Sequence, residues 1–180
     1  MVDKGVGLGG GLAEMAPHSP PRHAMMWAMA SLLLALAAAT TGLYAGFLLC
    51  FLTGIMPGLR PLPDDQFAVA MRSFNEKVPG PVFLVLFLGV IAFPIAALVV
   101  PVDGRTSAEG GLVVGALACA VLSHLVTVSG NIPLNSALAA AEDGDDSAAR
   151  RAFESRWNTL HRIRTALSTG AFALLVAAAV

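Results

Sequence analysis

The chain has 180 residues, of which 56% are hydrophobic and 13% are charged, and its formal net charge is -1. Its mean hydropathy of +0.73 lies well above that of a soluble domain, so composition predicts an integral membrane protein with the lipid bilayer as its partner. The charge argues against nucleic-acid binding, because no excess of basic residues can displace counterions from phosphates.

Residues 1–22 contain Gly9, Gly10 and Gly11 and then three prolines, without a periodic apolar pattern. This composition predicts a disordered N-terminal tail. The apolar run that follows continues to Met56, which is too long for a signal peptide and indicates a retained helix. Residues 23–180 are expected to form a single membrane domain.

Four stretches lack Asp, Glu, Lys and Arg: residues 23–59, 78–102, 110–141 and 165–180. About 20 helical residues cross a hydrocarbon core of roughly 30 Å, so the first three are long enough and the fourth is marginal. No proline interrupts residues 147–180, which allows one long helix there. The sequence predicts an all-α, four-transmembrane-helix bundle, with helices at about 25–54, 81–100, 109–129 and 148–180, the last spanning from about 163.

The loops between spans are expected to contain short amphipathic interfacial helices. The first span should end before Met56-Pro57-Gly58, and the next helix should begin at Asp64 and Asp65. In it, apolar residues recur at helical spacing, which places them on one face at the interface: Phe67, Met71, Phe74 and Val78. Gly130 and Pro133 should break the third helix, and residues 148–162 should form the second interfacial portion.

Small residues four apart predict close helix packing in the third span: Gly111, Gly115, Cys119 and Ser123. Gly42 and Gly46 offer a counterpart in the first span.

Basic residues indicate how the chain is oriented. Segments 57–80 and 143–164 carry eight of them: Arg60, Arg72, Lys77, Arg150, Arg151, Arg156, Arg162 and Arg164. The opposite side carries only Lys4, Arg22 and Arg105. By the positive-inside rule, both segments are predicted to be cytoplasmic and both termini outside, in the cytoplasmic membrane. Whether the chain forms a homo-oligomer is left open.

Three polar or amphipathic side chains share one face of the last predicted helix, since Trp157, His161 and Arg164 are three or four residues apart. An imidazole and a guanidinium are costly beside lipid, so their clustering suggests a site. For Arg164, an interfacial anchor and an inward role are both open. For Trp157, the aromatic belt at the membrane surface is the favoured structural interpretation.

His124, Asn131 and Asn135 approach the same boundary from the third span. The histidine could be a base, a metal or haem ligand, or a hydrogen-bonded packing residue. The asparagine amides could bond carbonyls freed where the helix ends, or contact a ligand. Tyr44 adds a polar group inside the first span. No nucleotide loop, nucleophile elbow or paired-cysteine metal motif is present.

These residues resemble the anthrone oxygenase family of small four-helix membrane proteins, many of which are known only as a domain of unknown function. The likeness covers about residues 35–180. It rests on Gly42-Leu43-Tyr44-Ala45-Gly46, Met56-Pro57-Gly58-Leu59, Asn75 before Pro79, Asn131-Ile132-Pro133-Leu134-Asn135 with Leu138, and Phe153, Trp157, His161 and Arg164-Thr165.

The resemblance implies oxidation of a small lipophilic, phenolic or polyketide-like molecule by O2, without a metal or other cofactor. In the family, the position of His161 is often an asparagine that pairs with the arginine, so a histidine could add a base or replace the amide. The expected catalytic residues are His161 or His124 as general base and Arg164 for the enolate-like anion. The expected substrate-binding residues are Asn131, Asn135, Trp157, Asn75 and Tyr44.

Two other functions fit the sequence. A non-catalytic membrane module, binding a ligand or supporting another protein, needs these side chains only to hold the helices together. Haem ligation by His124 and His161 is a third hypothesis.

Overall fold

Every regular element is helical in the computed structural model, which describes residues 22–101 and 105–180. Four helical stretches are long and apolar enough to span a membrane: Ala24–Leu59, Pro81–Val99, Ser107–Ala140 and Asp146–Ala179. The all-α, four-helix prediction is confirmed. The tail expected over residues 1–22 lies outside the described residues except for Arg22, where the first helix begins.

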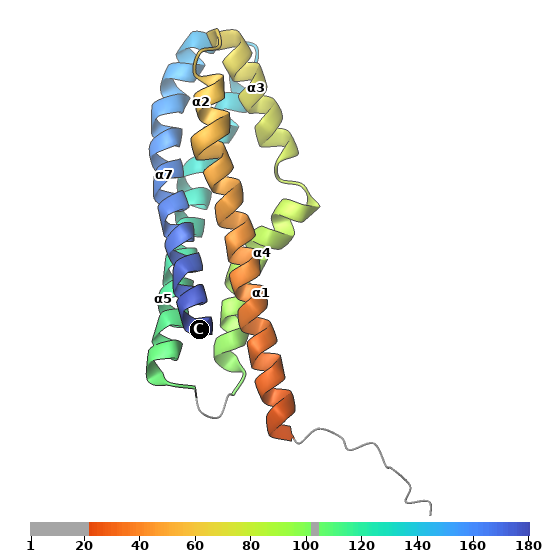
Figure 1. Cartoon of the computed structure of the whole chain (residues 1–180). Helices are drawn as coiled ribbons and strands as arrows, with labels where there is room; N and C mark the ends of the chain where they lie inside the picture. The colour runs from red at the N-terminus through yellow and green to blue at the C-terminus, as the bar shows by residue number, and fades with distance from the viewer. Residues whose placement is uncertain (1–21, 102–104) are drawn as a thin grey trace, which may run out of the picture.

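Figure 1 shows the order of the elements along the bundle. The first span is α1 (Arg22–Cys50), which continues through a π-helical turn, η1 (Phe51–Ile55), into α2 (Met56–Leu59). Next come α3 (Asp64–Lys77) and the second span, α4 (Pro81–Val99). The third span is α5 (Ser107–Val126), which continues through η2 (Thr127–Asn131) into α6 (Ile132–Ala140). The chain ends with α7 (Asp146–Ala179).

Pro57 and Pro133 do not end their helices, which corrects the sequence-based expectation. Each follows a π turn and occupies the start of the next helix, where a missing N–H costs little. In the turns, Met56 N–H donates to the Phe51 carbonyl and Ile132 N–H to the Thr127 carbonyl, five residues back. The wider turn lets the helix pass a proline while its backbone groups stay bonded, as a lipid environment requires.

The two turns also share a sequence pattern. Thr53-Gly54 precedes Pro57 as Ser129-Gly130 precedes Pro133. The Thr53 hydroxyl donates to the Leu49 carbonyl at 2.8 Å, and the Ser129 hydroxyl donates to the Leu125 carbonyl at 2.6 Å. The first and third spans therefore contain the same π turn, with a hydroxyl bonded to a backbone carbonyl and a proline after it, at the same end of the bundle.

Three of these small residues, Gly42, Gly115 and Ser123, pack on α7, which corrects the expectation that the first and third spans pair through them. A Cβ on Gly42 would lie 2.8 Å from the Phe172 ring, and one on Gly115 would lie 3.4 Å from Leu174. The Ser123 hydroxyl lies 2.9 Å from that of Ser168 on α7.

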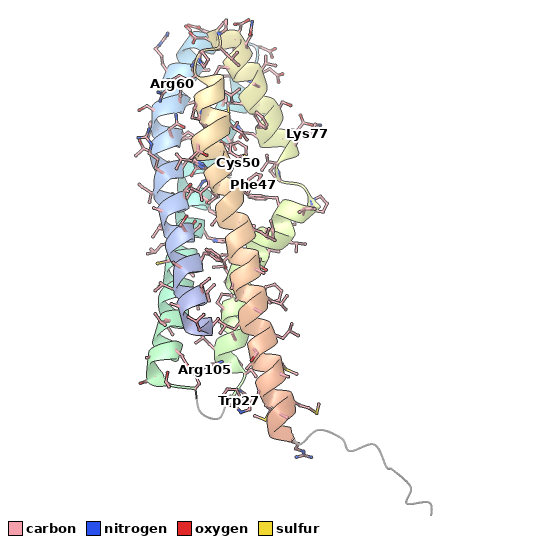
Figure 2. All side chains as sticks on the ribbon, in the orientation of Figure 1. Trp27, Phe47, Cys50, Arg60, Lys77 and Arg105 are labelled. Carbon is pink, nitrogen blue, oxygen red and sulfur yellow. The ribbon has the colours of Figure 1, made fainter. Side chains whose placement is uncertain are left out.

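One end of the bundle is closed by a cap, formed by α2, α3, α6 and residues 146–162 of α7. The apolar face of α3 buries Phe67 and Met71 in a cluster with Phe153 and Trp157 of α7. Arg72 donates to two carbonyls of the α6 end and to the Asp146 carboxylate, 2.8 Å away. Figure 2 places Arg60 and Lys77 at this end and Arg105 at the other.

Candidate functional site

A cavity of about 220 Å³ lies where the cap meets the spanning helices, and its walls are mainly apolar, with six aromatic residues. We call it the chamber. It is lined by Phe47, Phe51, Phe74, Asn75, Val78, Pro79, Phe83, Leu84, Phe87, Thr127, Asn131, Ile132, Asn135, Trp157 and Arg164. Leu84 and Ile132 are also exposed on the outside of the bundle, so the chamber opens sideways beside α4. Five of the eight predicted site residues line it.

Arg164 brings a cation into this apolar space. Its side chain belongs to α7 and only 8% of the residue is exposed. The Nε–H donates to His161 Nδ1 at 3.0 Å, Nη1 donates to the Thr127 hydroxyl at 3.4 Å, and the guanidinium carbon lies 5.4 Å from the Trp157 ring centre. No Asp or Glu within residues 22–101 and 105–180 forms an ion pair with it. A buried charge without a counter-ion is costly, so the geometry favours an anionic ligand.

His161 lies behind Arg164 and does not line the chamber. It is fully buried and stacks on Trp157, with 4.7 Å between ring centres. Its Nδ1 accepts the Arg164 hydrogen bond, so the ring proton must be on Nε2, which donates to the Leu48 carbonyl at 3.0 Å. Both nitrogens are occupied. The ring therefore accepts a hydrogen bond from the guanidinium, as in the amide-like role that the sequence left open beside that of a base.

Trp157 cross-links α7 to the η2–α6 segment. Its Nε1–H donates to Asn135 Oδ1 at 2.9 Å, and its backbone carbonyl accepts from Asn131 Nδ2 at 3.3 Å. With 2% of its surface exposed, Trp157 is a core residue, which corrects the interpretation as part of an aromatic belt. The asparagines bond α7 and do not cap the third helix.

These bonds fix which way two amides face. Because Asn131 Nδ2 must point to a carbonyl, its Oδ1 is left buried without a hydrogen-bond partner among the described residues. Because Asn135 Oδ1 accepts from the indole, its amino group is the one left for other partners. Asn75 near the end of α3 also has a buried Nδ2, which bonds no other residue in the described part of the chain. The chamber thus combines one free acceptor with several free donors.

Tyr44 and His124 lie outside the lining. The Tyr44 hydroxyl is buried close to Thr127 and Arg164 but makes no hydrogen bond with the described residues. His124 stacks on Phe87 with 4.0 Å between ring centres, and its nitrogens lie 2.9 Å from the Ala120 carbonyl and 2.6 Å from the Phe87 carbonyl. It braces α5 against α4. Iron ligation by either His124 or His161 would require one of these bonds to break.

The predicted site residues did not include Thr127 or the phenylalanines that line the chamber. Thr127 is the first residue of η2 and accepts from Arg164. Phe83 and Phe87 are four residues apart on α4 and line the chamber together. Their helical spacing just after Pro81 was the available signal, but it does not distinguish a cavity wall from ordinary core.

A family model described as anthrone oxygenase matches residues 67–174. The matched segment begins in α3 and includes Asn75, Asn131, Asn135, Trp157 and Arg164. No curated protein and no solved structure matches the chain.

Proposed function

Because the chain belongs to the anthrone oxygenase family, we propose that it oxidises a lipophilic phenolic or polyketide-like aromatic molecule with O2 in the chamber. The observation that carries this proposal is Arg164, a buried cation without a carboxylate partner among the described residues, facing a cavity with aromatic walls. A planar aromatic anion would pair with the Arg164 guanidinium and pack against the aromatic side chains of the chamber.

Polar groups around the chamber support binding of the substrate as an enolate or phenolate. Its anionic oxygen would accept from Arg164 and from the Asn135 amino group. A neighbouring hydroxyl of the substrate would donate to Asn131 Oδ1, which has no hydrogen-bond partner within residues 22–101 and 105–180. Fixed donors aimed at the developing negative charge stabilise the anion without reorganisation.

The chemistry then needs no external electron donor. The bound carbanion transfers one electron to O2, and the radical pair combines to form a carbon–oxygen bond. The peroxide anion takes up the proton lost on ionisation, and the hydroperoxide eliminates water. A CH2 group and O2 thus become C=O and H2O. In this proposal His161 is a positioning residue, because both its nitrogens are already bonded.

Substrate would reach the chamber from the membrane. Leu84 and Ile132, at its side opening, are 52% and 47% exposed on a surface that also carries Val85 and Val128. A molecule dissolved in lipid meets an apolar rim there. We place this end of the bundle on the cytoplasmic side of the cytoplasmic membrane, because eight of the eleven Lys and Arg residues lie in segments 57–80 and 143–164.

Oxygen uptake by the purified protein tests the proposal. With an anthrone as substrate, Arg164→Gln is expected to lower kcat/KM by about 100-fold or more, as removal of an oxyanion donor typically does. Arg105→Gln, at the other end of the bundle, serves as control and should leave kcat/KM unchanged. Folded wild-type protein without oxygen uptake on a panel of anthrones would refute the assignment.

The alternative is a non-catalytic membrane module. The bonds among Asn131, Asn135 and Trp157 favour it, because they join helices whether or not a ligand is present. In that case Asn135→Ala should lower the yield of folded protein, and an aromatic ligand should bind without oxygen consumption.

A further inference from the structure

A second hollow, of about 360 Å³, lies on the other face of α7, away from the chamber. Its lining is entirely polar and comes from the α2–α3 connection and the cap portion of α7: Arg60, Asp64, Arg150, Arg151, Glu154, Ser155, Asn158, Thr159 and Arg162. Four arginines face two carboxylates, which leaves two net positive charges. None of these residues takes part in the proposed oxidation.

Both carboxylates are already paired with one arginine. Arg150 Nε donates to Glu154 at 2.8 Å, and its Nη1 donates to Asp64 at 3.1 Å. The same guanidinium donates to the Arg60 and Leu62 carbonyls at 2.8 and 2.7 Å. Arg150 therefore builds the wall of the hollow and holds both of its carboxylates by hydrogen bonds.

The other three arginines are left to bind an anion. Arg60, Arg151 and Arg162 form no ion pair with any described Asp or Glu. In the part of the chain that the structure describes, the Arg151 side chain donates only to the Ser147 hydroxyl, at 3.0 Å. Guanidinium groups match phosphate oxygens in geometry and charge, and the Asn158 amide in the same wall can add a donor.

The position of the hollow specifies what kind of phosphate it would meet. Arg162 is the last outward-facing charge on α7, because after the buried Arg164 no charged residue follows to the end of the helix. Exposed apolar residues follow on the same helix. Ile163, directly after Arg162, is 45% exposed, Phe172 is 37% exposed and Val176 is 40% exposed. A lipid whose acyl chains lie along this surface has its headgroup level with the hollow.

We propose that this hollow binds the phosphate headgroup of an anionic phospholipid. Arg60 and Arg162 hold the phosphate from the α2 and α7 sides, and Arg150 keeps the two sides together. The site is independent of the oxidation chemistry, so binding and oxygen uptake can fail separately.

Native mass spectrometry and thermal unfolding of the detergent-solubilised protein test this site. Titration with phosphatidylglycerol, phosphatidylcholine and inorganic phosphate compares an anionic lipid, a zwitterionic lipid and the free anion. The double variant Arg60→Gln/Arg162→Gln is expected to weaken phosphatidylglycerol binding roughly 30-fold, about fivefold for each arginine. Arg156→Gln is the matched control, since Arg156 is exposed on the same helix but outside the lining.

Four results would overturn the proposal. The first two are phosphatidylcholine binding as tight as that of phosphatidylglycerol, and wild-type phosphatidylglycerol binding by the double variant. The third is a loss of binding in Arg156→Gln as large as in the double variant, which would indicate general surface charge. Stabilisation by inorganic phosphate equal to that by the lipid would assign the hollow to a free anion. Because both arginines are exposed, circular dichroism of the double variant should match the wild type.

Discussion

Replacement of His161 distinguishes between two roles for its imidazole, the positioning of Arg164 and general-base catalysis. In His161→Phe the ring can still stack on Trp157, but Arg164 Nε–H and the Leu48 carbonyl lose their partners inside the bundle. An unpartnered buried polar group costs about 1–3 kcal/mol, and more when it is charged, so we expect a loss of roughly 3–5 kcal/mol. His161→Asn can return one acceptor to the guanidinium and should lose only about half as much.

Unfolding in detergent followed by circular dichroism measures the stabilities, and oxygen uptake measures the activities. If His161 positions Arg164, the asparagine variant should keep kcat/KM within about tenfold of wild type. The phenylalanine variant should lose much more activity, because its guanidinium is no longer held. A stable asparagine variant that has lost activity about 1000-fold would refute this reasoning and show that the imidazole acts as a base.

The remaining predictions concern packing and helix capping. Gly42→Ala should destabilise the protein by about 1–3 kcal/mol, because the new methyl group would meet the Phe172 ring at 2.8 Å. Gly46→Ala, four residues on with nothing within 4 Å, is the control and should be neutral or stabilising in unfolding experiments; equal losses would contradict the packing. Hydrogen bonds from the Ser147 hydroxyl and then from backbone N–H groups at the start of α7 hold the pKa of Asp145 below its usual value. Its stabilising effect should therefore be complete above the unfolded-state pKa and disappear as the pH falls through the lower folded-state pKa. Asp145→Asn should accordingly lower the melting temperature at pH 7 but no longer do so in acid, and a difference that persists in acid would argue against the charge effect.

Helix number and the outline of the site could be predicted because both depend on solvation. Long uncharged runs must cross the bilayer as helices, and costly side chains such as Arg164 and His161 gather where they can bond one another. The amphipathic pattern that begins at Asp64 and buries Phe67 was equally readable, since it is periodic.

Partners far apart in the sequence could not be predicted. Nothing near His161 indicates that the Leu48 carbonyl, 113 residues earlier, will face its Nε2. Nor does the pattern around Trp157 distinguish a membrane-surface indole from one that donates to Asn135. The prolines were misread for a different reason: Gly130 and Pro133 together favour a helix end locally, but a wider turn satisfies the backbone at lower cost.

The π turn before Pro133 has a consequence for the angular phase of the helix. Each residue turns an α-helix by about 100°, and the hydrogen bond spanning five residues in η2 accommodates one residue more than a regular turn. Everything after it, including Asn135, is rotated relative to α5 by that extra residue. The same holds for α2 after η1. A chain with one residue fewer at either turn would still be helical and apolar, yet its next helix would present a different side to α7. The rotation that the two π turns give to α2 and α6 therefore determines which side chains line the chamber, as much as the identity of those side chains does.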